Sequence, residues 1–292
     1  MARASKGLQD AITVTVVHPV WQKTKPESDN HAGWYFGVSK EEEKHKAWTN
    51  HEGRGGPFSD HFPENEPDPF MGAKSIRDIY ESVNDTVGKY TVPILFDKKT
   101  KQIVSNESSE IIRMFNTEMN EFAKYPEVDI YPESMREEIE AVNEWVYPGL
   151  NNGVYRCGFA VSQGAYDKAI EELTAAFDKV DQILQKQRFI AGDTFTEADI
   201  RLFVTLVRFD EVYIVYFKTN TRSITHTPSI LNYCREIYQM PGVKETVNMD
   251  HIKTHYFCSH PTLNHYSIVP KGNNFIGLLE QPHDREELFP SK

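Results

Sequence analysis

The chain has 292 residues and a net formal charge of −11, from 32 basic and 43 acidic side chains. This balance argues against a general nucleic-acid binder, because contact with phosphates needs a basic surface. No apolar run approaches the roughly 18 residues of a membrane span and the first eight residues carry no secretory signal, so we expect a cytoplasmic protein that neither spans a membrane nor binds nucleic acid.

The first predicted element is a strand over residues 11–18, a β-branched run that ends before Pro19. Residues 21–69 are polar, rich in glycine and proline, and lack the periodicity of a regular element. A helix over residues 73–82, a hairpin of strands 92–96 and 102–105, and a helix from Glu107 follow. These elements indicate a small α/β domain.

From about residue 131 the pattern becomes helical. Apolar residues recur at helical spacing over residues 136–146, 165–184, 197–209 and 230–238. We therefore predict an α/β domain over residues 1–125, an all-helical domain over residues 130–265, and a Pro/Gly-rich tail over residues 266–292.

An α/β domain of thioredoxin type followed by an all-α domain is the architecture of the glutathione transferases. Thr91-Val-Pro-Ile-Leu95 resembles their strand with its cis-proline, residues 106–112 resemble the helix start that holds the γ-glutamyl group, and Thr196-Glu-Ala-Asp199 resembles their N-capping box. Five longer blocks, at residues 31–34, 151–159, 205–213, 238–243 and 255–260, resemble one class: the glutathionyl-hydroquinone reductases, or Xi-class glutathione transferases.

The resemblance implies a glutathione-dependent reduction of glutathionyl-hydroquinones, with glutathione as co-substrate and no metal. In this scheme a cysteine thiolate attacks the sulfur of the conjugate, the hydroquinone leaves, and a second glutathione resolves the mixed disulfide. It also implies a homodimer whose partners are glutathione and quinone-derived small molecules.

Seven residues match the positions at which this family contacts glutathione: Trp34, Lys89, Tyr90, Thr91, Val92, Glu107 and Ser108. Three of these residues have a simpler alternative. Glu107 and Ser108 can equally be an ordinary helix cap, because capping and ligand contact use the same groups. Trp34 can equally be an aromatic anchor for the long loop.

Three tyrosines match the family's catalytic positions. By resemblance, Tyr155 exchanges a proton with the quinol oxygen, while Tyr213 and Tyr256 donate hydrogen bonds to the thiolate. Phenols donate at neutral pH and their rings can stack on an aromatic substrate. His251 and His255 have the i, i+4 spacing of a metal-binding pair, but no carboxylate or cysteine pattern completes a recognised site.

The family's nucleophile lies in a Cys-Pro-Trp-type motif between the first strand and the first helix, and that motif is absent from these 292 residues. Residues 1–7 align with the end of the first helix. We therefore expect the thioredoxin-like domain to be incomplete, without its first strand and most of its first helix. Cys157, Cys234 and Cys258 share no CxxC spacing and are expected to be buried, reduced thiols.

Two hypotheses follow. The first, which we favour, is that the chain is an incomplete copy of an active reductase whose start is placed at an internal methionine, so that the chain as given is inactive. The second is that it is a non-catalytic glutathione or quinone binder, or a subunit partner. Conjugation by a tyrosine- or serine-activated glutathione is a third alternative, but the activating group would also belong to the absent segment.

Overall fold

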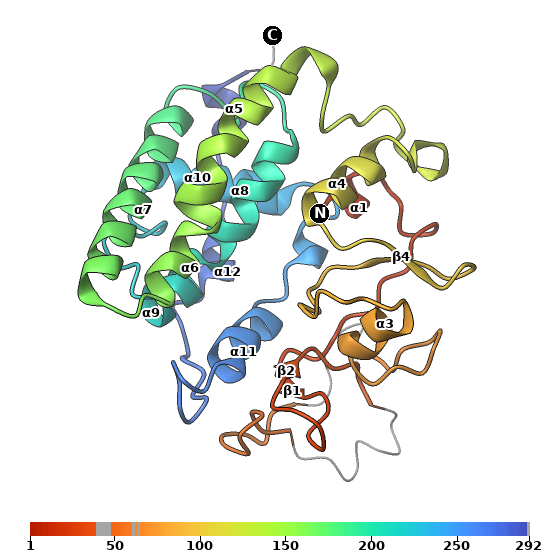
Figure 1. Cartoon of the computed structure of the whole chain (residues 1–292). Helices are drawn as coiled ribbons and strands as arrows, with labels where there is room; N and C mark the ends of the chain where they lie inside the picture. The colour runs from red at the N-terminus through yellow and green to blue at the C-terminus, as the bar shows by residue number, and fades with distance from the viewer. Residues whose placement is uncertain (39–47, 60–61, 63–64, 291–292) are drawn as a thin grey trace. The chain divides into compact units, whose positions relative to one another are not determined.

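The computed structural model describes residues 1–38, 48–59, 62 and 65–290 (Figure 1). Contacts divide the chain into two compact units. Ile12–Met114 and Asn248–Pro270 form one, here called the α/β unit, and Met1–Ala11, Phe115–Val247 and Lys271–Lys292 form the other, the helical unit. The predicted domains grouped the chain differently, because they assigned residues 1–11 to the α/β domain and residues 248–265 to the helical one.

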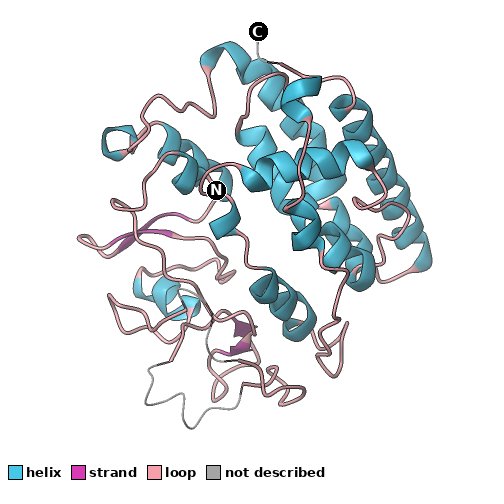
Figure 2. Cartoon of the chain, turned by 180° about the vertical axis from the view of Figure 1, so that it is seen from behind, coloured by secondary structure: helices cyan, strands magenta, loops and turns pink. Residues whose placement is uncertain are grey.

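The α/β unit contains little regular strand (Figure 2). Its two antiparallel pairs are β1 with β2 and β3 with β4. The elements are β1 (Gln22–Lys23), β2 (Ala32–Gly33), α3 (Ile76–Ser82), β3 (Leu95–Asp97), β4 (Gln102–Ser105), α4 (Ser108–Asn116, which continues into the helical unit) and α11 (Met249–Ser259). The predicted hairpin and the helices before and after it are therefore present.

The strand predicted over residues 11–18 is wrong. Among the described residues, this segment has one β-type pairing, an isolated parallel bridge from Val16 to Asn65. Val14 is 40% exposed although its β-branched side chain favours a buried strand. A strand needs a hydrogen-bonded neighbour along its length, and the segment has a single bridge instead.

A small apolar cluster lies at the centre of the α/β unit. Phe36 and three α3 residues, Ile76, Ile79 and Tyr80, are buried together, and Trp34, Tyr90 and Val92 pack against them. The start of α3 is fixed by a capping box, in which Ser75 accepts from the Asp78 backbone and the Asp78 carboxylate accepts from the Ser75 N–H. This packing places three of the predicted glutathione contacts against one core.

In the helical unit, α5, α7, α8 and α10 lie side by side (Figure 1). Buried residues of α7 recur at helical spacing: Ala169, Ile170, Leu173, Phe177, Val180 and Leu184. The elements are α1 (Ala2–Ser5), η1 (Asn120–Phe122), η2 (Glu133–Met135), α5 (Arg136–Val146), η3 (Tyr147–Asn151), α6 (Gly153–Gly158), α7 (Gln163–Leu184), α8 (Glu197–Arg208), η4 (Phe209–Tyr213), α9 (Ile214–Tyr216), α10 (Pro228–Gln239), η5 (Lys244–Thr246), α12 (Phe275–Leu279) and α13 (Arg285–Leu288).

The predicted helices over residues 136–146, 165–184, 197–209 and 230–238 correspond to α5, α7, α8 and α10. The capping box expected at Thr196 and Asp199 is also present at the start of α8. Lys6 shows why the first residues join this unit: its ammonium is buried and donates to Asn120 Oδ1 at 2.6 Å and to the Val128 carbonyl at 2.6 Å.

Residues 266–292 were predicted to be a tail, but the described part of this segment is packed. Phe275 and Leu279 of α12 are fully buried, and Arg285 of α13 is 1% exposed. No helix in the described chain is long and apolar enough to cross a membrane.

Candidate functional site

The segment before Pro93 is held in place by one tyrosine hydroxyl. The Val92–Pro93 peptide bond is cis, as the sequence predicted. The Tyr80 hydroxyl donates to the Thr91 carbonyl at 3.0 Å and accepts from Asn106 Nδ2 at 2.9 Å. Thr91 and the residue just before Glu107 are thus tied to the same α3 side chain, so two separate predicted glutathione contacts lie in one place.

The start of α4 bears on the alternative left open for Glu107 and Ser108. The Ser105 hydroxyl accepts from the Glu107 N–H at 3.1 Å and donates to the Glu110 carboxylate at 2.9 Å. Ser105 is buried, whereas the side chains of Glu107 and Ser108 are exposed. Ser105 thus makes side-chain contacts of the capping type, while Glu107 and Ser108 are exposed at a helix N-terminus, where anionic and polar ligands bind favourably.

Trp34 belongs to an aromatic group within the α/β unit. Its ring stacks on His255 of α11, with centroids 4.3 Å apart and planes at 26°, and meets Trp21 edge-on at 5.7 Å. Its carbonyl accepts from the Ile76 N–H at 3.0 Å, at the start of α3. The half-buried Trp34 is therefore fixed from both sides, which a ligand contact and a loop anchor both require.

Tyr90 is held by charged and aromatic neighbours. The Arg77 guanidinium lies 5.4 Å from the ring centroid, and His31 approaches edge-on at 5.1 Å. Arg77 in turn binds Glu81 and Asp29, each at 2.7 Å. A hydrogen bond from Arg77 holds the pKa of Asp29 below its ordinary value, and burial, with Arg77 nearby, lowers the pKa of His31. Lys89, next to Tyr90, is exposed.

The histidines of α11 serve the fold. His251 Nε2 lies 3.0 Å from the Val17 carbonyl oxygen, and His255 Nδ1 lies 2.9 Å from that of Pro19. A carbonyl oxygen only accepts, so a ring nitrogen that is protonated donates to it; the Ser259 hydroxyl also donates to the Pro19 carbonyl at 2.9 Å. The two side chains thus fasten α11 to residues 17–19. Among the described residues, no group of three or more His, Cys, Asp or Glu side chains could hold a metal ion.

Two of the three predicted catalytic tyrosines lie together in the helical unit. The ring centroids of Tyr155 and Tyr213 are 6.2 Å apart, and Phe217 lies against both, at 5.4 Å and 5.5 Å. Tyr155 is 37% exposed, whereas Tyr213 is 2% exposed. The two residues come from α6 and η4, and Gly158 lets Phe217 approach, because a Cβ there would lie 2.0 Å from the Phe217 ring.

The backbone around this pair is unusual. Tyr213 is the last residue of η4, which is a π-helical turn, and a second π-helical turn, η3, precedes α6. Such turns insert one residue into a helix and are frequent at functional sites. Asn151 connects η3 to α8, the helix that η4 follows, since its Nδ2 donates to the Thr205 hydroxyl at 2.6 Å.

Tyr256 belongs to the other unit. It lies on α11, is 7% exposed, and contacts the His255 ring edge-on at 5.3 Å. The α/β unit therefore contains Tyr256 together with all seven predicted glutathione contacts, and the helical unit contains Tyr155 and Tyr213.

None of the three cysteines has the character of a nucleophile. All three are free and buried, as the sequence predicted. Burial raises the pKa of Cys157 to about 11 and that of Cys258 to about 12, and it raises the pKa of Cys234 further still. The three thiols are therefore neutral at physiological pH, and a neutral thiol is a poor nucleophile.

Sequence reasoning missed four residues that fix these groups: Tyr80, Asn106, His255 and Phe217. Their roles depend on contacts between segments far apart in the chain. The signal that came nearest was the i, i+4 spacing of His251 and His255, which suggested His255 as a metal ligand and not as the ring on which Trp34 stacks.

Comparison with known proteins assigns the chain to a family. Residues 163–234 match the model of the glutathione S-transferase C-terminal domain. The glutathionyl-hydroquinone reductase YqjG of Escherichia coli is 39% identical over 291 residues, covering 98% of this chain and 78% of that protein. The reductase PcpF of Sphingobium chlorophenolicum is 43% identical over 207 residues, covering 70% of this chain and 66% of that protein.

Solved structures agree. The glutathione-bound structure of YqjG has a TM-score of 0.83 at 39% identity, covering 99% of this chain and 83% of that one. Glutathione transferase Xi 1 from Trametes versicolor has a TM-score of 0.81 at 43% identity, covering 94% and 86%. These likenesses confirm the predicted fold class, a thioredoxin-like domain with an all-α glutathione-transferase domain. The chain belongs to the glutathionyl-hydroquinone reductases, the Xi class of glutathione transferases.

Proposed function

We propose that this chain takes part in the glutathione-dependent reduction of glutathionyl-hydroquinones to hydroquinones. The observation that carries the proposal is the convergence on Tyr80, whose hydroxyl joins the backbone before the cis-proline to the segment that opens α4. Peptide ligands are commonly bound by backbone pairing with an extended segment. An exposed acid and hydroxyl at the adjacent helix N-terminus supply partners for the charged end of glutathione.

In this proposal Glu107 binds the α-amino group of glutathione, and Ser108 with the free N–H groups of α4 binds its α-carboxylate. The Val92 backbone pairs with the cysteinyl part. Trp34, Tyr90 and Thr91 line the same ligand, and Lys89 contributes charge. Lysine carries a point charge without the bidentate fork of arginine, so the Lys89 contact is the most adaptable of the set.

The reaction balances as one conjugate and one free glutathione giving the hydroquinone and glutathione disulfide. The carbon–sulfur bond breaks, the ring carbon gains a proton, and a sulfur–sulfur bond forms. We assign proton exchange with the quinol oxygen to Tyr155, because its ring is accessible to solvent and lies against Tyr213. Tyr213 and Tyr256 are assigned, by resemblance, as hydrogen-bond donors to the attacking cysteine thiolate of the family's scheme.

A second function is favoured by the thiols. All three cysteines are buried and their pKa values are raised, so none supplies the attacking thiolate. The 292 residues can therefore act as a glutathione or quinone binder, or as a subunit partner, without turnover of their own. The two functions share the glutathione site and differ in the chemistry.

Titration calorimetry with glutathione tests the shared site. Trp34→Ala should weaken glutathione binding about tenfold, the scale of one lost aromatic contact. Trp145→Ala is the matched control, because Trp145 lies in α5 of the helical unit under the Lys179 ammonium, and it should leave the affinity unchanged. Equal affinity in the parent and in Trp34→Ala would contradict the assignment.

Glu107→Gln tests the charged end of the site. The expected loss is again about tenfold, since a charge-assisted hydrogen bond becomes a neutral one. Glu118→Gln, an exposed carboxylate two residues beyond the end of α4, is the control. If both variants bind glutathione like the parent, Glu107 does not contact the ligand.

Turnover separates the two functions. The purified chain is mixed with glutathione and a glutathionyl-hydroquinone, and hydroquinone release is followed by chromatography. Release above the rate without protein supports the reductase and rules out the non-catalytic binder. Glutathione binding without release would show that these 292 residues bind glutathione without turning over the conjugate, in agreement with the three buried cysteines. We also propose that the protein is a homodimer in the cytoplasm, for which sedimentation velocity and cell fractionation are the direct measurements.

A further inference from the structure

The turn that carries Tyr213 holds two buried carboxylates, side by side in the sequence. Asp210 is 8% exposed and Glu211 is 4% exposed, and both belong to η4. Buried acidic groups are costly unless hydrogen bonds satisfy them. Their partners therefore show what fixes this turn, and with it the ring of Tyr213.

Asp210 binds a loop of the helical unit. Its Oδ1 accepts from the Ile224 N–H at 2.8 Å, and its Oδ2 accepts from the Thr225 N–H at 2.9 Å and from the Ser223 hydroxyl at 3.0 Å. Ile224 is fully buried. One carboxylate thus gathers the three residues of this loop against η4.

Glu211 binds the C-terminal segment, residues 271–290. Its Oε1 accepts from the Phe275 N–H at 3.0 Å and from the Asn273 N–H at 3.2 Å, at the start of α12. Phe275 is fully buried. Each of these bonds joins a charged acceptor to a backbone donor, the stronger type of hydrogen bond.

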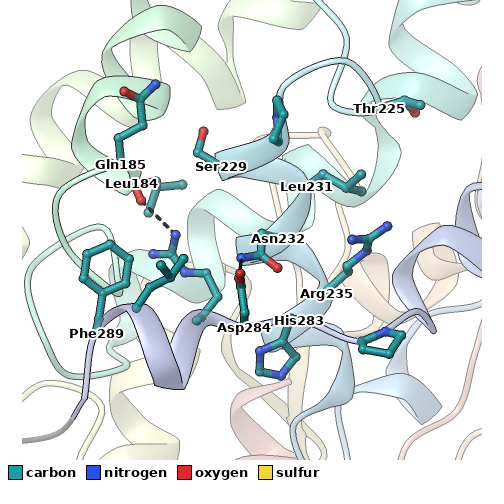
Figure 3. A pocket seen from close by; sticks show the side chains of 14 residues that line it. Leu184, Gln185, Thr225, Ser229, Leu231, Asn232, Arg235, His283, Asp284 and Phe289 are labelled. Carbon is teal, nitrogen blue, oxygen red and sulfur yellow. Dashed lines mark hydrogen bonds between the residues drawn. The ribbon is translucent and has the colours of Figure 1, made fainter.

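The far end of the same segment is fastened to α7 and α10. The Arg285 guanidinium donates to the Leu184 carbonyl at 2.8 Å and to the Gln187 carbonyl at 2.7 Å, at the C-terminus of α7. An open groove of about 920 Å³ runs along this part of the segment, and Asn232 of α10 meets Asp284 in it (Figure 3). We call residues 271–290 the strap. Glu211 of η4 binds its first part, and Arg285 attaches its far part to the end of α7.

Tyr213 depends on this arrangement through η4. Its carbonyl accepts from the Phe217 and Thr219 N–H groups, at 3.0 Å and 3.2 Å, and its ring stacks on Phe217 with planes at 8°. A π-helical turn is rare and mostly occurs as a single turn within an α-helix. Asp210 and Glu211 bind residues outside η4, so these bonds connect the turn, and the phenol at its end, to two other segments of the helical unit.

We propose that Glu211 is a positioning residue for Tyr213, acting through the strap formed by residues 271–290. The proposal rests on the proposed function, in which the Tyr213 hydroxyl donates a hydrogen bond in the site. Glu211→Ala withdraws the acceptor from two backbone N–H groups. Glu211→Asp withdraws it by one methylene and keeps the charge, whereas Glu211→Gln keeps an oxygen at the same reach.

The experiment uses the full chain labelled with 3-fluorotyrosine, and the ¹⁹F resonance of Tyr213 is assigned by its loss in Tyr213→Phe. In Glu211→Ala and Glu211→Asp this resonance should shift or broaden, and in Glu211→Gln it should return to the parent position. Affinity for 1,4-benzohydroquinone, measured anaerobically with glutathione present, should fall about tenfold in the first two variants, because a displaced Tyr213 ring also displaces its neighbour Tyr155, to which the proposed function assigns the quinol oxygen.

Asn116→Ala is the matched control. Asn116 is buried and its Oδ1 accepts from the Ile130 N–H at 2.9 Å, so this variant also strands a buried backbone donor but away from η4. It should lower the melting temperature and leave the Tyr213 resonance in place. Glu211→Asp keeps the test open if Glu211→Ala does not fold.

An unmoved Tyr213 resonance in folded Glu211→Ala or Glu211→Asp, with a loss of stability like that of the control, overturns the proposal, because Glu211 would then only stabilise the fold. If the parent does not bind the hydroquinone, the proposed function fails at that point. The resonance alone then decides whether Glu211 positions Tyr213.

Discussion

Asp199→Asn should strongly destabilise the helical unit. The Asp199 carboxylate is fully buried. Its Oδ1 accepts from the Ile190 N–H at 2.9 Å and the Tyr233 hydroxyl at 2.8 Å, and its Oδ2 accepts from the Thr196 N–H at 2.8 Å and hydroxyl at 3.2 Å. Each carboxylate oxygen of Asp199 accepts two hydrogen bonds. An asparagine amide keeps one of these oxygens and replaces the other by an NH₂ group, which only donates, whichever way the amide is turned.

The magnitude follows from these bonds. The two hydroxyls can rotate to accept from the new amide, but either orientation leaves one backbone N–H, of Ile190 or Thr196, without its acceptor. A buried unsatisfied donor costs about 1–3 kcal/mol. The surviving bonds also lose their charge assistance, while removal of a buried charge offsets part of that loss. The free energy of unfolding should fall by about 2–4 kcal/mol at pH 7.

Urea unfolding followed by circular dichroism measures this difference, with the exposed Asp10→Asn as control. Burial raises the pKa of Asp199 to about 6. The folded parent therefore binds this proton before the unfolded chain does, so this group adds stability as the pH falls from about 6 toward the unfolded value near 4. The gap between parent and variant should widen from pH 7 to pH 5. A gap below about 0.5 kcal/mol, or one that narrows, would refute the reasoning.

Three further outcomes are expected. Gly158→Ala should lower the free energy of unfolding by about 1–3 kcal/mol, because the added methyl overlaps the Phe217 ring; an equally stable variant would mean that the ring moves freely. Iodoacetamide at pH 7.5 should modify none of the cysteines in the native chain, since their raised pKa values keep them neutral, and mass spectrometry would detect any adduct. The α/β unit should lose stability as the pH falls through 6.5, because burial lowers the folded-state pKa of three of its histidines. The unfolded chain therefore binds these protons more readily than the folded one. Tryptophan fluorescence would follow unfolding as a function of pH, and a stability that does not change with pH would contradict the prediction. These histidines are His31, His51 and His260.

Helices were predicted well because their signals are local. Apolar residues at helical spacing defined α5, α7, α8 and α10, and Thr196 with Asp199 marked the start of α8. The segment 11–18 failed for the opposite reason. Its alternating β-branched residues describe one strand, but a strand exists only with a partner, and a single-residue bridge to Asn65 is what the described chain provides.

The site was predictable as a set of positions and not as a set of contacts. Resemblance selected Thr91, Glu107, Tyr155 and Tyr213, yet nothing in their neighbourhood in the sequence indicated the side chains that hold them. Phe217 lies between two tyrosines 58 residues apart in the chain, and its role appears only when α6 and η4 are packed. The C-terminal segment has the proline and glycine content typical of a tail, while its buried phenylalanine and arginine are isolated in the sequence.

The Tyr80 hydroxyl has a consequence for the thermodynamics of ligand binding. It crosslinks the segment before Pro93 to the residue that precedes Glu107, so the protein's own groups hold the two walls of the proposed glutathione site together. Ordering a loop on binding costs conformational entropy, which lowers affinity. Removing this hydroxyl, as in Tyr80→Phe, would transfer that cost to the binding step: the enthalpy of association could remain nearly the same while the entropy became less favourable. Affinity in this site would then be set partly by an atom that never touches the ligand.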